Sequence, residues 1–79
     1  MQPVFTRHVL QRMAQRRIER ADVMSVLSEH LHVLPTPEGS TRFDGVPRGD
    51  GRVLKVWVVG SPPQTEPMVV KSAAWKGGI

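Results

Sequence analysis

The chain has 79 residues, a net charge of +4 and no cysteine, which excludes disulfides and thiolate metal sites. Its length allows one domain, residues 1–79. A composition of 39% hydrophobic and 23% charged residues is typical of a folded soluble domain. No apolar run approaches the ~20 residues of a membrane span. No signal-peptide core opens the chain, so we expect a cytoplasmic protein without membrane association.

Two helices are predicted in the first 30 residues. Thr6 is a favourable N-cap for a helix over residues 7–16, and Glu19 opens a second helix that ends near Glu29 or His30. Apolar residues recur in both segments at the spacing of one helical face, which is typical of helices that pack on a core. We expect the core to contain Val9, Met13, Val23, Leu27, Leu54, Val56, Val58 and Val70.

The rest of the chain predicts strands. Residues 30–34 show the alternating side-chain pattern of an extended strand, and residues 41–44 form a short strand. Two longer strands cover residues 52–59 and 68–75. Loops rich in proline and glycine separate them, including Ser61–Pro67. Short connections between consecutive strands favour an antiparallel meander. We therefore predict an α+β domain with two N-terminal helices packed on one face of a three- to four-stranded antiparallel sheet.

The alternation also predicts which side chains the helices leave uncovered. Leu54, Val56 and Val58 should face the helices, because successive strand residues point to opposite faces. The opposite face then carries Arg42, Lys55, Trp57, Lys71 and Trp75. Cations bind phosphates and an exposed tryptophan can stack on an unpaired base, so Arg42, Lys55, Trp57 and Lys71 are candidate nucleic-acid-binding residues. Alternatively, the tryptophans pack beneath loops.

The positive charge lies in the first segment. Residues 1–20 contain five arginines against Glu19 alone, whereas the remaining residues balance six bases with six acids. His8, Arg12 and Arg16 follow at i, i+4 and i+8 on one side of the first helix. A histidine transfers protons near neutral pH, arginines hold phosphates, and RNA supplies its own 2′-hydroxyl nucleophile. These three residues are therefore candidate catalytic residues for RNA cleavage.

A structural role for the same row remains open at this point. Arg12 and Arg16 could instead bridge the carboxylates of Asp22 or Glu29. His30 and His32 could supply half of a metal site, but no third ligand is evident near them. We expect no bound metal and no cofactor.

The His8-Arg12-Arg16 row belongs to a longer pattern, H-x3-R-M-x2-R-x-I, followed by D-V-x2-V-L at residues 22–27. The pattern resembles a widespread family of small bacterial and phage domains of unknown function, allied to RelE-like and BrnT-like toxins. The resemblance implies an α+β fold of the RelE-like or barnase-like ribonuclease type, action on RNA, and an antitoxin-like partner. The chain departs from the pattern at Arg17, where the family often has glycine, and it lacks the tyrosine of some RelE-like toxins.

These observations predict a small basic domain that binds RNA or another polyanion, with metal-independent ribonuclease activity as a further hypothesis. His8 would transfer a proton, and Arg12 and Arg16 would hold the scissile phosphate. The alternative is a non-catalytic adaptor or inhibitor, of phage origin, that binds an acidic protein surface or nucleic-acid-binding machinery. A cleft joining His8 to a base from the late strands would favour the enzyme. A flat basic surface would favour the binding module.

Overall fold

The computed structural model describes residues 3–61 and 67–77. Most of the predicted loop Ser61–Pro67 and the last two residues of the chain lie outside the described residues. The elements in chain order are β1 (Val4–Phe5), α1 (Arg7–Gln15), α2 (Arg20–Ser28), β2 (His32–Pro35), β3 (Ser40–Gly45), β4 (Leu54–Val59) and β5 (Val69–Trp75).

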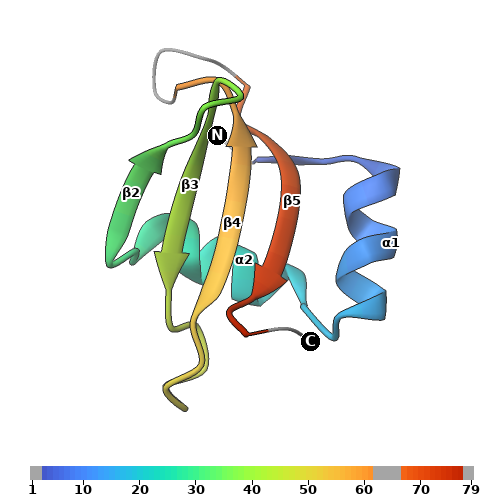
Figure 1. Ribbon diagram of the computed structural model, residues 1–79. Helices are drawn as coiled ribbons and strands as arrows, with labels where there is room; N and C mark the ends of the chain where they lie inside the picture. The colour runs from blue at the N-terminus through green and yellow to red at the C-terminus, as the bar shows by residue number, and fades with distance from the viewer. Residues whose placement is uncertain (1–2, 62–66, 78–79) are drawn as a thin grey trace.

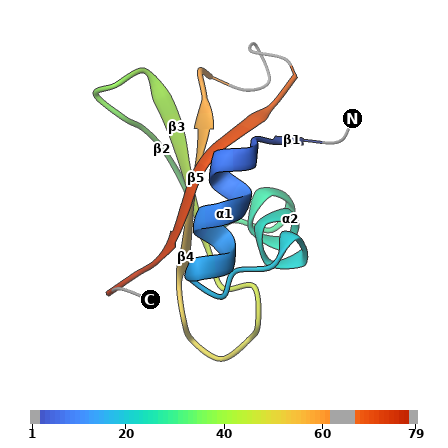
Figure 2. The same cartoon turned by 90° about the vertical axis from the view of Figure 1, so that its right-hand side faces the viewer.

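A five-stranded sheet forms one layer of the fold and two helices form the other. The strand order is β1-β5-β4-β3-β2 (Figure 1). Figure 2 shows both helices on the same side of the sheet. α1 packs against β5, and α2 crosses behind β3 and β4. The predicted α+β class and the placement of both helices on one face are therefore confirmed.

The prediction of a three- to four-stranded antiparallel sheet is correct for four strands but misses a fifth, parallel strand. β2 to β5 form the expected antiparallel meander. β1 adds a fifth strand that pairs in parallel with β5, with Val4 opposite Val69 and Phe5 opposite Val70. Two residues are too few to show an alternating pattern, so this strand has no signature in the sequence.

The core lies between the sheet and the helices, as the two periodicities predict. Leu54, Val56 and Val58 are all 0% exposed, which confirms the assignment of their face of β4 to the core. Seven of the eight expected core residues are buried, and Leu27 is half-buried against the same cluster. α1 begins as predicted, because Thr6 Oγ1 accepts a 3.1 Å hydrogen bond from the backbone N–H of Val9.

The predicted placement of Trp75 on the sheet face without helices was wrong because β5 contains a bulge. The register between β4 and β5 shifts beyond Trp57, which leaves Lys71 as an extra residue in β5. One extra residue reverses the alternation along the rest of the strand. Ala73 and Trp75 therefore face the helices, and Trp75 is only 3% exposed.

Candidate functional site

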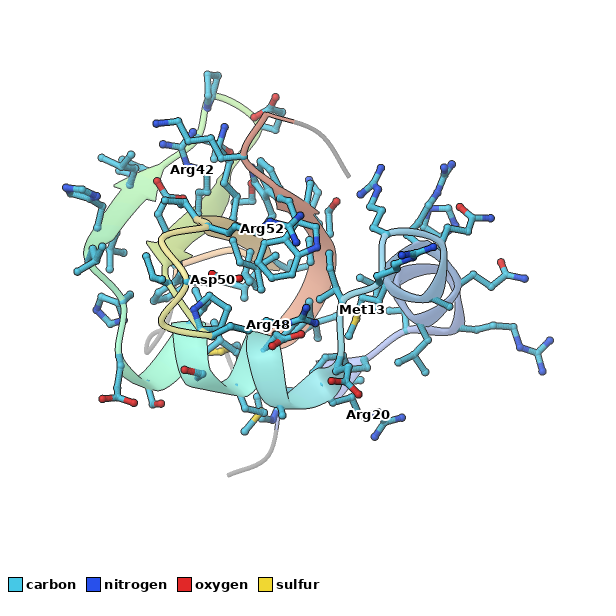
Figure 3. The ribbon with its side chains drawn as sticks, turned by 90° about the horizontal axis from the view of Figure 1, so that it is seen from below. Met13, Arg20, Arg42, Arg48, Asp50 and Arg52 are labelled. Atoms are coloured by element: carbon cyan, nitrogen blue, oxygen red, sulfur yellow. The ribbon has the colours of Figure 1, made fainter. Side chains whose placement is uncertain are left out.

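α1 ends at the lower end of the molecule in Figure 1, the same end as the loop between β3 and β4, and these two segments supply three arginines to one site. They line a hollow of about 300 Å³ whose wall consists of Gln15, Arg16, Arg17 and Arg52. None of these lining residues is acidic, and we call the site the arginine hollow. Figure 3 views this end of the molecule and shows Arg52 on the loop, with Arg20 pointing away from it.

Arg16 is held in place by the free edge of β5. Among the described residues, β1 pairs with Val69 and Val70 alone, so the lower part of β5 has no described strand beside it on that side. Nη1 of Arg16 donates a 2.7 Å hydrogen bond to the carbonyl of Ala73 in this part of the strand. The backbone carbonyl of Arg16 accepts a 2.9 Å hydrogen bond from Nε1 of Trp75. These two bonds fix the end of α1 against the sheet.

The buried indole of Trp75 supports the arginines of the loop. The guanidinium carbon of Arg52 lies 4.3 Å from the ring centroid, and that of Arg48 lies 5.0 Å from it. Cation–π contacts of this kind gain strength where water is excluded. The backbone N–H of Arg52 also donates a 3.0 Å hydrogen bond to Oδ1 of Asp50, which orders the loop. Arg52 is thus positioned by an aromatic ring, and no carboxylate among the described residues forms an ion pair with it.

Arg17 adopts a backbone conformation that arginine rarely takes. Its φ is 56°, in the left-handed region. The N–H of Ile18 donates to the carbonyl of Met13 at 2.8 Å, and the N–H of Arg17 donates to that of Ala14 at 3.3 Å. This is the Schellman pattern, in which glycine normally occupies the left-handed position. A residue with a Cβ is strained there by about 1–2 kcal/mol, yet the chain carries an arginine at the hollow.

Arg48 differs from the lining arginines because Asp22 neutralises it. Nη2 and Nε of Arg48 donate to the two oxygens of Asp22 at 2.7 and 3.0 Å. Nη2 also donates to the backbone carbonyl of Arg17 at 3.1 Å, which ties the loop to the end of α1. The hydrogen bonds from Arg48, helped by the backbone N–H of Glu19, hold the pKa of Asp22 below its ordinary value despite burial. Arg48 therefore braces the arginine hollow and adds little charge to it.

The predicted row on α1 leads toward the arginine hollow, but only its last member lines the hollow. His8 and Arg12 are exposed, and Arg16 is half-buried. Within the described part of the chain, no carboxylate forms an ion pair with Arg12 or Arg16, because Asp22 is paired with Arg48. The bridging role considered for the two arginines is thus not realised there. His8 and Arg12 stand on an exposed helix surface outside the hollow, so His8 does not share a cleft with Arg52.

Comparison with protein families places the chain. Residues 5–73 match the model of a family described as a domain of unknown function, DUF4258. The chain belongs to this family. The matched segment contains both helices and most of the sheet. Comparison with curated proteins and with solved structures finds no match.

The other residues predicted to bind nucleic acid lie on the sheet face that the helices leave free. Trp57 and Lys55 are half-buried there, and Lys71 is exposed. Arg42 is engaged by Asp44, since its Nε lies 3.0 Å from Oδ1 and its Nη2 donates to Oδ2 at 3.2 Å. Lys55, Trp57 and Lys71 thus remain more accessible to a ligand than Arg42 does.

Sequence reasoning missed Arg17 and Arg52 as members of the site. Arg17 carried a signal, because arginine stands where glycine is expected after a helix. Arg52 carried none, because it was assigned to the start of a strand and its position depends on a buried Trp75.

No metal site and no membrane span emerge from residues 3–61 and 67–77. No three of the described histidine and acidic residues lie close enough together to hold a metal ion. Neither described helix is long and apolar enough to cross a bilayer.

Proposed function

We propose that this domain binds single-stranded RNA through the arginine hollow. The observation that carries the proposal is the convergence of Arg16, Arg17 and Arg52 on one hollow without an acidic lining residue. Arginine matches the oxygens of a phosphate with paired N–H donors. Phosphate backbones favour such clusters because binding releases condensed counterions.

The three arginines keep donors available for a ligand. Arg16 uses Nη1 on the carbonyl of Ala73, and a guanidinium carries five N–H donors in all. Arg52 lies over the ring of Trp75, a contact that leaves its N–H groups free of any carboxylate among the described residues. Because contacts within the fold already order these two side chains, phosphate binding costs less conformational entropy. Arg12 extends the positive surface along α1, and His8 lies one turn further along the same helix.

The RelE-like and BrnT-like affiliation that the N-terminal motif implies is part of this proposal. An antitoxin-like partner would then act by covering the arginine hollow. A convex helix surface with exposed cations suits binding better than catalysis, so we place RNA binding first.

RNA cleavage is the second candidate function, because His8 and Arg12 lie one helical turn apart and a substrate can reach both. We expect cleavage, where it occurs, to require the 2′-hydroxyl and to persist with a chelator present. The measurement compares an RNA with its 2′-deoxy counterpart, using wild type and His8→Ala. Full activity of His8→Ala, or equal cleavage of the deoxy strand, would contradict this role of His8. Absence of cleavage with intact binding supports the binding module.

The test of RNA binding is a salt titration. The affinity for a short single-stranded RNA should fall as salt rises, with a slope of about −0.7 per phosphate contact on a log–log plot. Three contacts predict a slope near −2. An affinity that does not change with salt would contradict the proposal. Binding to an acidic polypeptide but not to RNA would favour the adaptor that the sequence left open.

A further inference from the structure

A second hollow lies on the sheet face that the helices leave free. It measures about 200 Å³ and is lined by Glu38, Ser40, Trp57, Lys71 and Ser72. The mixture differs from that of the arginine hollow, since an aromatic ring, a carboxylate, a cation and two hydroxyls meet here. An aromatic plane beside hydrogen-bonding groups suits a flat polar ligand.

The sheet positions the ring and the cation. Trp57 lies opposite Ser72 in the ladder between β4 and β5, on the face turned away from the core. The bulge that buries Trp75 also makes Lys71 the extra residue of β5. Bulges commonly redirect a side chain toward a site, and Lys71 lines this hollow. A single irregularity thus removes one tryptophan from the surface and places a lysine beside the other.

The carboxylate is held by the turn between β2 and β3. The hydroxyl of Thr36 lies 2.6 Å from Oγ of Ser40, whose backbone N–H donates to the same Thr36 oxygen at 3.2 Å, and this pair orders the turn that carries Glu38. The hydrogen bond from Thr36, with the positive charge of Lys71, holds the pKa of Glu38 below its ordinary value. Glu38 is therefore an ionised acceptor at neutral pH, and it lines the hollow.

A guanine base matches these groups. Its N1–H and N2–H₂ are adjacent donors that can pair with the two oxygens of one carboxylate, while its ring stacks on an aromatic side chain. Uracil offers a single N–H donor that lies between two carbonyl oxygens, and these oxygens and a carboxylate repel each other. We propose that the hollow of Glu38, Trp57 and Lys71 binds a guanine base of single-stranded RNA, with Lys71 contacting the adjoining phosphate. The inference rests on the proposed RNA binding and adds base preference to it.

The arginine hollow lies on the helix side of the sheet and the second hollow on its free face, so one RNA strand would have to pass around the edge of the fold to contact both. Arg52 precedes Trp57 by five residues, so their Cα atoms are at most about 18 Å apart. Glu38 disfavours phosphate in the second hollow, and the arginines favour it in the first. Phosphate contacts would supply most of the affinity, and the base contact would supply the preference.

The experiment measures the affinity of uridine decamers that contain one central guanosine, inosine or uridine. Inosine lacks the N2 amino group, so it isolates one of the two donors. Quenching of Trp57 fluorescence reports stacking directly, because Trp75 is buried. We expect the guanosine strand to bind about tenfold more tightly than the uridine strand, with inosine between them.

Glu38→Gln should remove the preference for guanosine and leave the uridine strand bound as in wild type or better, because a negative charge is lost. Glu29→Gln is the matched control, since Glu29 is an exposed glutamate at the end of α2 and should leave the preference intact. Trp57→Leu should remove the quenching.

Three outcomes separate the two proposals. A preference for guanosine that Glu38→Gln abolishes supports the base site. Salt-dependent binding of all strands with equal affinity overturns the base site and leaves RNA binding in place. Absence of binding to every strand overturns both.

Discussion

Arg17 combines a strained backbone with a charge that the fold does not neutralise. Its φ of 56° belongs to a position that glycine fills in most Schellman motifs. Strain of this kind persists where the surrounding structure enforces it and tends to mark functional sites. We read the arginine as a residue kept for its charge at the expense of stability.

Replacing Arg17 with glycine should therefore stabilise the protein. We expect Arg17→Gly to raise the free energy of unfolding by about 0.5–1 kcal/mol, because glycine relieves the strain and loses part of the gain to its greater unfolded-state entropy. Urea denaturation of both proteins measures this change. A lower stability for Arg17→Gly would mean that the arginine side chain makes contacts worth more than the strain. RNA affinity of the same variant should fall.

The two tryptophans should respond differently to truncation. Trp75 is 3% exposed and donates to the carbonyl of Arg16, so Trp75→Phe removes a buried hydrogen bond and leaves a void. We expect a loss of about 2–3 kcal/mol in unfolding free energy. Trp57→Phe, on the free sheet face, should cost less than about 1 kcal/mol. Similar losses at the two positions would contradict the assignment of Trp75 to the core face and Trp57 to the free face of the sheet.

Between elements, the pair of Asp22 and Arg48 joins α2 to the loop between β3 and β4. Because the pKa of Asp22 is lowered in the folded protein, its stabilisation is present above the ordinary value of 3.8 and is lost as the pH falls through the lowered one. We expect Asp22→Asn to lose about 1–2 kcal/mol at pH 7. The stability of this variant should also depend less on pH than the stability of the wild type does, between about pH 5 and pH 2. Urea unfolding at both ends of this range measures the effect, and an unchanged pH dependence would contradict it.

Sequence patterns correctly predicted the elements that are determined by residues close together in the chain. Thr6 and the apolar residues of α1 specify a helix by themselves, and valines at alternate positions specify the buried face of β4. β1 and the bulge at Lys71 escaped prediction because each depends on a register set by a distant strand. A one-residue change of register moves every later side chain to the other face, which is why Trp75 was misplaced.

The candidate site was predictable only in part for the same reason. Arg16 was found because it continues the helical spacing of His8 and Arg12. Arg52 joins it only through Trp75, whose position follows from the bulge. A local pattern therefore cannot show that α1 and the loop between β3 and β4 meet at one hollow.

Over the whole molecule, the net charge of +4 comes from residues 1–20, and two of the arginines in this segment, Arg16 and Arg17, line the arginine hollow. Arg42 and Arg48 are paired with Asp44 and Asp22, so these internal pairs do not contribute to the field outside. Arg16, Arg17 and Arg52 lack such partners in the part of the chain that the structure describes. We therefore expect RNA affinity to depend on the position of each positive charge as well as on the total charge of the protein.

The most direct measurement compares two double variants that remove the same charge. Arg17→Gly with Arg52→Gln alters the arginine hollow, whereas Arg7→Gln with Arg20→Gln alters exposed positions that do not line it. At a fixed salt concentration, the first double variant should weaken the binding of a single-stranded RNA much more than the second double variant does. The first double variant should also reduce the steepness of the log–log salt dependence by about 1.4, at ~0.7 per lost phosphate contact. Equal losses from the two pairs would show that total charge, and not the arginine hollow, governs binding, and would contradict the account.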